Sequence, residues 1–328
     1  MAMGQQARRS LGTRNSGPWM RTGPWKLNTT APAPHMRFVP TTRAQYLASV
    51  FTIWNVLDVN IARTYGLLGG AKTKNRPSTP YGYMREVQLH AYSDLLWQHP
   101  GVRTYCEVGF NGGHGTAAML LASPSLQVHS FELGLFPYTR TAQEDLRSYF
   151  GDRFHAHVGN SRKTIPAFAA DLARTSGRTD VCDVILIDGD HRAGGVYADL
   201  LSFRPLAACN ATVLIDDLNE GPGEALQRLR SEGVVEVLEQ HEYTLENSPE
   251  TNCVRCMHPA KEGQVPCING FRCFPKWGWA MARYTAGCAT GSGANVRVAA
   301  APPTTASASK FASGRRGGGR RGRGAARE

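Results

Sequence analysis

The sequence predicts an α/β fold in which helices cover both faces of a doubly wound, mostly parallel sheet. Short apolar runs bounded by turn residues alternate with helical patterns, as expected for the buried strands of such a sheet. The first of these runs breaks into a glycine-rich loop, and several later runs end abruptly in carboxylates. The chain has 328 residues, enough for one such domain with additional segments at its ends.

The strand Arg103–Val108 leads into a loop that reads Gly-Phe-Asn-Gly-Gly-His-Gly over residues 109–115. Glycines let the backbone pass close to a ligand, although an ordinary strand-to-helix turn is the alternative interpretation. The dinucleotide fingerprint G-x-G-x-x-G is absent because residue 111 is Asn. The loop therefore favours a cofactor without a phosphate, such as S-adenosylmethionine. Glu107 at the strand end suits the positive ammonium and sulfonium charges of that cofactor.

The next two predicted strands also end in polar residues. Gln127–Phe131 ends at Glu132, where a carboxylate can accept hydrogen bonds from both ribose hydroxyls of a nucleoside. His155–Val158 leads into a polar turn that contains Asn160 and Ser161, and Ser161 is a candidate cap for the following helix. Both strand ends therefore suit a nucleoside-containing cofactor.

Two more apolar strands end in acidic residues. Val184–Ile187 precedes the motif Asp-Gly-Asp-His at residues 188–191, and Thr212–Ile215 precedes Asp216 and Asp217. Because the carboxyl ends of parallel strands meet at one edge of a sheet, these carboxylates should converge there.

The stretch from Tyr83 to Tyr284 resembles the Rossmann-like class I S-adenosylmethionine-dependent methyltransferases, and within them the branch of macrocin-type sugar O-methyltransferases. The most specific element runs from Ile187 to Leu200, where Asp-Gly-Asp-His is followed by a helix. The resemblance implies a sheet whose last strand is reversed and a cofactor site at the strand ends. We assign this site to Glu107, Gly109, Asn111, Gly113, Glu132, Asn160, Ser161 and Asp188.

In the metal-dependent members of that family, the acidic ends of the fourth and fifth strands hold a divalent cation. This pattern matches Asp188, Asp216 and Asp217. Three carboxylates at one edge repel one another unless a cation or protons intervene. Oxygen ligands favour magnesium, calcium or manganese over zinc, and we expect magnesium or manganese. The alternative is that Asp188 or Asp216 caps the following helix.

His191 is the candidate general base, because an imidazole can accept the proton of an attacking hydroxyl near neutral pH. Asp190 could orient His191 or bind the substrate, and the sequence does not decide between these roles. The alternative for His191 is a hydrogen bond within its own loop.

Two helical patterns precede the first strand, within residues 41–100. One starts at Thr41 or Thr42 and the other spans Tyr83–Gln98. The apolar residues that define them are Tyr46, Val50, Trp54, Leu57, Ile61, Val87, Ala91 and Leu95. These helices either help to cover the cofactor and substrate or only pack on the sheet.

After Asp217 the sequence predicts a helix at Gly223–Ser231 and two strands at Val234–Glu239 and Trp277–Tyr284. The connection between the strands forms an insert at residues 252–275 that contains Cys253, Cys256, Cys267 and Cys273. Their spacing is compatible with a zinc site, with disulfides or with free thiols. We expect Cys106, Cys182 and Cys209 to be small buried hydrophobic residues.

The net charge of +11 comes from the two ends of the chain. Residues 1–57 hold seven Lys or Arg and no acid, and residues 291–328 hold eight against one Glu, so the remainder is slightly acidic. We expect residues 1–40 to be a disordered basic segment that resembles an organellar transit peptide; a cytoplasmic location is the alternative. We expect the Arg/Gly-rich tail at 291–328 to be disordered as well.

Two functions remain open at this stage, with residues 101–290 as the catalytic domain. The first is an S-adenosylmethionine-dependent methyltransferase that acts on a hydroxyl of a small molecule with help from a divalent cation. The second is an RNA-associated methyltransferase or a non-catalytic binding module, because Arg-Gly runs bind RNA weakly and without sequence preference. No segment of the sequence is apolar for long enough to span a membrane.

Overall fold

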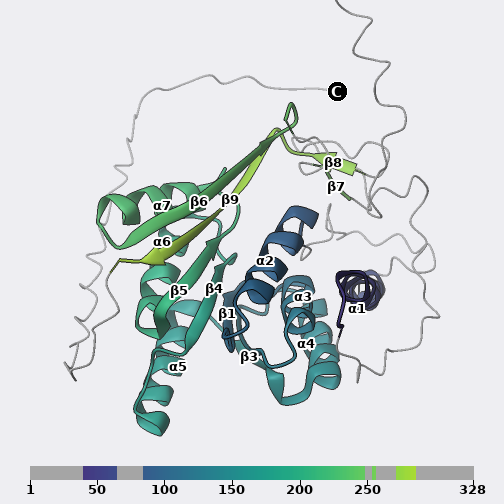
Figure 1. Ribbon diagram of the computed structural model, residues 1–328, viewed down its shortest axis with the longest axis horizontal. Coiled ribbons are helices and arrows are strands. Elements are labelled where there is room, and N and C mark those ends of the chain that lie inside the picture. The colour runs from purple at the N-terminus through teal and green to yellow at the C-terminus, as the bar shows by residue number, and fades with distance from the viewer. Residues whose placement is uncertain (1–39, 65–83, 248–252, 256–270, 286–328) are drawn as a thin grey trace, which may run out of the picture. The chain divides into compact units, whose positions relative to one another are not determined.

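The computed structural model describes residues 40–64, 84–247, 253–255 and 271–285, and their main feature is a seven-stranded sheet (Figure 1). Its strands are β1 (Thr104–Val108), β2 (Gln127–Glu132), β3 (Phe154–Val158), β4 (Cys182–Ile187), β5 (Ala207–Ile215), β6 (Val235–Thr244) and β9 (Lys276–Tyr284). Their order is β3-β2-β1-β4-β5-β9-β6. The strands β1 to β5 are parallel, whereas β9 runs antiparallel to both β5 and β6. The predicted Rossmann-like sheet with a reversed last strand is therefore confirmed.

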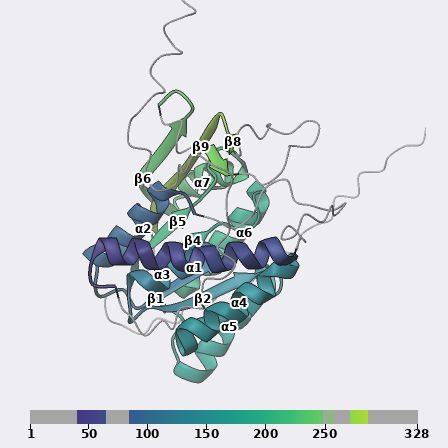
Figure 2. The same ribbon diagram turned by 90° about the vertical axis from the view of Figure 1, so that its right-hand side faces the viewer.

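The helices form two layers, one on each face of the sheet (Figure 1). One layer contains α1 (Arg43–Thr64), α2 (Glu86–Gln98), α3 (His114–Ala122) and α4 (Pro137–Phe150). The other contains α5 (Ser161–Ser176), α6 (Ala193–Phe203) and α7 (Gly221–Ser231). Two short 3-10 helices, η1 (Gly151–Arg153) and η2 (Arg204–Leu206), precede β3 and β5. Figure 2 shows α1 crossing α3 and α4, with which it makes contacts along its length.

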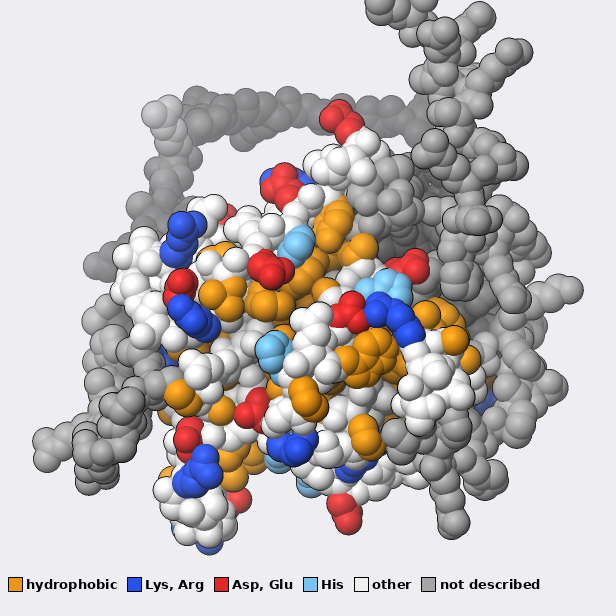
Figure 3. Space-filling view, viewed as in Figure 1, with side chains coloured by type: hydrophobic (Ala, Val, Ile, Leu, Met, Phe, Trp, Pro, Cys, Tyr) orange, Lys and Arg blue, Asp and Glu red, His pale blue; other side chains and the backbone are white. Residues whose placement is uncertain are grey.

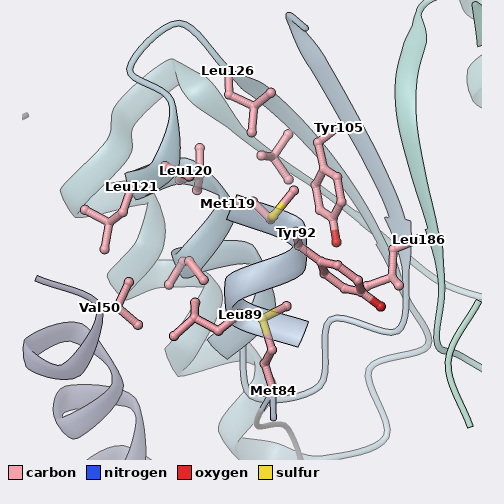
Figure 4. Packing of buried hydrophobic residues seen from close by; sticks show 14 of the residues in the cluster. Val50, Met84, Leu89, Tyr92, Tyr105, Met119, Leu120, Leu121, Leu126 and Leu186 are labelled. Carbon is pink, nitrogen blue, oxygen red and sulfur yellow. The ribbon is translucent and has the colours of Figure 1, made fainter. Parts of the chain in front are cut away.

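Successive strand residues face opposite helix layers, as the period of two in a strand requires. Tyr105 packs with the layer of α1 to α4, and its neighbour Cys106 packs with the layer of α5 to α7. Figure 4 shows the first of these cores, where Leu89 and Tyr92 of α2 meet Tyr105 and Met119. Side chains from both layers thus fix the sheet and the position of its carboxyl edge.

The helical pattern predicted from Thr41 is confirmed, because its five periodic apolar residues are all buried along α1. The second pattern starts three residues later than predicted, at Glu86, and its buried stripe is rotated. Leu89 and Tyr92 are buried, whereas Val87 and Ala91 are only partly buried. The rotation also buries Gln88, a polar residue.

A disulfide joins Cys106 of β1 to Cys182 of β4, and both residues are fully buried. Their predicted burial is correct, but the prediction of unpaired hydrophobic side chains is wrong. Cys209 is disulfide-bonded as well. Disulfides persist mainly in oxidising compartments.

The cysteine-rich insert contains two short antiparallel strands, β7 (Cys253–Arg255) and β8 (Phe271–Cys273), in which Cys253 lies opposite Cys273. Cys256 and Cys267 lie outside the described residues, so the choice between zinc, disulfides and thiols stays a prediction. The predicted N-terminal segment and Arg/Gly-rich tail also lie outside them. None of the described helices is long and apolar enough to cross a membrane.

Candidate active site

A cavity of about 950 Å³ opens at the carboxyl edge of the sheet. The ends of β1, β2, β4 and β5 line it together with the start of α2 and the start of β9. Seven of the eight predicted cofactor residues line this cavity, namely Glu107, Gly109, Asn111, Glu132, Asn160, Ser161 and Asp188. The cavity also holds the residues predicted for a cation, so the sequence motifs converge on one site.

Glycine is required at positions 109 and 113 because neighbouring protein atoms leave no room for a side chain. A side chain at Gly109 would meet the carbonyl oxygen of Asp188 at 1.9 Å, because the β1 and β4 loops touch there. Gly113 has φ +80° just before α3, and a side chain there would meet the ring of Phe110 at 2.6 Å. Gly113 is not among the residues that line the cavity, so its contact with a cofactor stays a prediction.

The two glutamates at the strand ends differ in their surroundings. Glu107 is buried and accepts a hydrogen bond from the hydroxyl of Thr116, and burial raises the pKa of Glu107 to about 7. Glu132 accepts backbone N–H groups from Asn111 at 2.8 Å and from Gly134 at 2.9 Å. These two bonds hold the Glu132 carboxylate at the cavity wall.

The turn after β3 also lines the cavity through Asn160 and Ser161. The Asn160 side chain accepts the backbone N–H of Arg162 at 3.0 Å and so caps α5. The helix cap predicted at Ser161 is therefore wrong by one residue. The Asn160 carboxamide keeps its N–H₂ group for other partners, since only its oxygen serves the cap.

Asp188, His191 and Asp217 form a compact group in which one ligand atom of each lies within 4.8 Å of the others. His191 Nε2 is 3.3 Å from Asp217 Oδ2 and 3.7 Å from Asp188 Oδ1. Burial raises the pKa of Asp188 and of Asp217 to about 6. The charge of Asp188 adds to the shift of Asp217, and the charge of Asp216 adds to the shift of Asp188. The two acids thus resist simultaneous ionisation unless positive charge is near.

Asp216, predicted as a third cation ligand, lies outside this group and has other partners. Its carboxylate accepts hydrogen bonds from Gln88 Nε2 at 2.8 Å and from Trp277 Nε1 at 3.1 Å. Asp216 and Asp217 both follow the end of β5, and Asp217 has a left-handed backbone conformation (φ +51°), so their side chains face different surroundings. Asp216 therefore ties α2 and β9 to the sheet edge instead of joining the group of Asp188.

Of the two roles that the sequence leaves open for Asp190, the observed contacts of its carboxylate do not favour the orientation of His191, and substrate binding stays a prediction. Asp190 pairs with Arg192, whose Nη2 lies 2.7 Å from Asp190 Oδ2. The contact to the imidazole comes instead from Glu220, whose Oε2 lies 3.0 Å from His191 Nδ1. Sequence reasoning missed Glu220, because it precedes the start that the sequence predicted for the next helix.

Three carboxylates surround His191. The neighbouring Asp188 raises the pKa of His191 to about 10, and Asp217 and Glu220 act in the same direction. Without a cation, the imidazole is therefore protonated at neutral pH and cannot accept another proton.

The start of α2 forms another wall of the cavity. The guanidinium of Arg85 stacks on the ring of Trp277, with Cζ 3.9 Å from the ring centroid. Its charge lowers the pKa values of Asp188, Asp216 and Asp217, against the larger effect of burial. Sequence reasoning missed both Arg85 and Trp277, although the predicted helix and strand contain them.

Residues 106–218 match the model of a family described as a methyltransferase domain. This segment is therefore similar to a methyltransferase domain. It contains the glycine loop, Glu132 and the group of Asp188, and the sheet around it has the class I methyltransferase fold. No curated protein matches the sequence.

Several solved structures resemble the methyltransferase domain and its surroundings at low identity. An O-methyltransferase from Bacillus cereus in complex with SAH is 15% identical, with a TM-score of 0.47, and the match covers 76% of this chain and 94% of that one. TomG from Streptomyces achromogenes, an O-methyltransferase of tomaymycin synthesis in complex with SAM, is 14% identical, with 70% and 89% covered and a TM-score of 0.45. SAH-bound PaMTH1 from Podospora anserina is 13% identical, with 76% and 99% covered and a TM-score of 0.41.

Proposed function

We propose that the protein transfers a methyl group from S-adenosylmethionine to a hydroxyl of a small molecule, with help from a divalent cation. One observation supports this most strongly. A single cavity joins the Glu132 side of the methyltransferase domain to the group of Asp188, His191 and Asp217. A methyl donor and an acceptor could therefore meet inside it.

The residues on the Glu132 side of the cavity suit the cofactor. The Glu132 oxygens each accept one backbone N–H and have lone pairs left for the ribose hydroxyls. Asn160 and Ser161 lie across the same cavity and offer polar groups to the base. Glu107, which lines the cavity at the end of β1, offers its carboxyl oxygens to the ammonium group of the cofactor, and that positive charge would favour the ionised form of Glu107.

The group of Asp188, His191 and Asp217 suits a cation. Two ligands of one cation with bonds of about 2.0 to 2.2 Å lie roughly 3 to 3.4 Å apart. The separations of 3.3 and 3.7 Å around His191 Nε2 are close to this range. Bound positive charge would also relieve the repulsion between Asp188 and Asp217. We therefore replace Asp216 by His191 in the proposed ligand set.

When bound, S-adenosylmethionine supplies an electrophilic methyl group, and a divalent cation lowers the pKa of the acceptor hydroxyl. Glu132 and the glycine loop hold the donor, and Asp188 and Asp217 hold the acceptor side. Both nitrogens of His191 face carboxylates, so the geometry favours a ligand role for it over the free base we predicted. Catalysis then rests mainly on positioning, and the proton can leave to water.

The choice of a small-molecule hydroxyl rests on two points. The Asp-Gly-Asp-His stretch resembles that of macrocin-type O-methyltransferases. In addition, on the face of the described residues that Figure 3 shows, acidic and basic side chains are interspersed, and this face has no broad basic area for RNA. Weak RNA binding by the Arg/Gly-rich tail remains a separate prediction, because the tail lies outside the described residues.

Calorimetry with the full-length protein tests this proposal. We expect S-adenosylhomocysteine to bind and NAD to show no heat, because the dinucleotide fingerprint is absent. Methyl transfer to hydroxyl acceptors should fall with EDTA and return with magnesium or manganese. Absence of S-adenosylhomocysteine binding would refute the cofactor, whereas full turnover after exhaustive chelation would refute only the cation.

A further inference from the structure

We infer that Glu220 is a positioning residue that turns His191 into a nitrogen ligand of the cation. The inference rests on the proposed cation site and adds a residue that lies outside the matched domain segment. Its starting point is the 3.0 Å contact between Glu220 Oε2 and His191 Nδ1.

This contact decides what the other ring nitrogen can do. A carboxylate beside Nδ1 favours the tautomer that carries its proton there. Nε2 then holds the lone pair, and Nε2 is the atom that faces Asp188 and Asp217. A carboxylate that accepts the second N–H of a ligating histidine fixes the ring and increases the basicity of the ligand nitrogen.

Glu220 has this orientation for a reason other than helix capping. It occupies the N-cap position of α7, yet its side chain makes no capping hydrogen bond. Glutamate is also not among the residues preferred at this position. The carboxylate reaches across to the β4 loop instead, where it meets the imidazole.

Close packing of two loops fixes the distance between Glu220 and His191. A side chain at Gly221 would meet the backbone nitrogen of Ala193 at 2.3 Å and the His191 carbonyl oxygen at 2.5 Å. The start of α7 therefore touches the backbone that carries the imidazole. The Glu220 N–H also donates to the Asp217 carbonyl at 3.0 Å, which links it to the third member of the site.

The test measures Mn²⁺ binding by calorimetry and ligand nitrogen by electron spin-echo modulation. We expect the unmodified protein to bind one Mn²⁺ with a clear ¹⁴N coupling, which Glu220→Ala should weaken together with a loss of roughly 10- to 100-fold in affinity. Glu220→Gln should retain most of both, because its amide oxygen can still accept the Nδ1–H. His191→Gln provides the spectrum without a histidine ligand.

Glu224→Ala is the matched control, because it removes an exposed carboxylate from the first turn of the same helix. It should change the Mn²⁺ affinity less than twofold, and S-adenosylhomocysteine affinity should stay constant in all variants. Equal losses in Glu220→Ala and Glu220→Gln would mean a charge effect and overturn the inference, as would Mn²⁺ binding without ¹⁴N coupling. A protein that binds no Mn²⁺ would overturn both this inference and the proposed cation, whereas S-adenosylhomocysteine binding would still support the cofactor.

Discussion

Replacing Gln88 by Met should destabilise the protein although it conserves the size of the side chain. Gln88 is buried and has two roles at the start of α2. Its Nε2 donates to the Asp216 carboxylate at 2.8 Å, and its Oε1 accepts the backbone N–H of Arg85 at 3.0 Å. A thioether can replace neither bond, so the buried Asp216 carboxylate and the partly buried Arg85 N–H each lose a partner.

The expected cost follows from these two bonds. A hydrogen bond to a charged group contributes roughly 1.5 to 3 kcal/mol, and a helix-capping bond contributes about 1 kcal/mol. We therefore expect the free energy of unfolding to fall by about 2 to 4 kcal/mol at pH 8. Burial raises the pKa of Asp216 to about 6, so at pH 5 the carboxyl group is mostly protonated in the folded state. The cost of the substitution should then be smaller.

Urea unfolding followed by circular dichroism at both pH values measures this cost. Gln98→Met is the control, because it makes the same chemical change at the exposed end of the same helix. A change below about 0.5 kcal/mol for Gln88→Met would refute the reasoning. An equal cost at pH 5 and pH 8 would show that the charge on Asp216 is not involved.

Three further predictions concern other parts of the site. Glu132→Ala should weaken S-adenosylhomocysteine binding by roughly 1 to 3 kcal/mol in calorimetry, because ribose hydroxyls lose their acceptor; unchanged affinity would remove Glu132 from the cofactor site. The pKa of His191 is about 10 when folded and near 6.5 when unfolded, so its contribution to stability is present below pH 6.5 and is lost as pH rises to 10. Urea unfolding of the cation-free protein should show this loss, and His191→Gln should remove that part of the pH dependence; a variant with the same profile as the unmodified protein would contradict the assignment. Cys106→Ala, Cys182→Ala and the double variant should each lose about 4 to 5 kcal/mol, since the bond closes a loop of 76 residues. Additive losses in the double variant would contradict the bond.

The sequence was sufficient to predict the strands and the edge at which they end. Apolar runs such as Val184–Ile187 and Thr212–Ile215 are short, bounded by polar residues and therefore easy to place. The acids that follow them could be assigned to one edge because parallel strands end together. The observed sheet agrees with this part of the analysis.

The partners of those acids could not be predicted in the same way. The contact between Gln88 and Asp216 joins residues 128 positions apart, and only the rotation of α2 against the sheet creates it. The contact between Glu220 and His191 depends on how closely two loops pack. The different surroundings of Asp216 and Asp217 could not be predicted either, because the chain leaves β5 before them and Asp217 has a left-handed backbone conformation, with φ +51°.

The Cys106–Cys182 bond joins the neighbouring strands β1 and β4 within the sheet, behind the carboxyl edge at which the cavity opens. Strands β1, β2 and β3 carry the groups proposed for the cofactor, and β4 and β5 carry those proposed for the cation. A covalent link across this boundary prevents the two blocks of strands from sliding or separating during a catalytic cycle. Any closure around ligands must therefore come from the loops and helices at the edge. The sheet itself stays rigid during this closure. Its complete assembly includes the disulfide and therefore depends on the redox state of the compartment in which the chain folds.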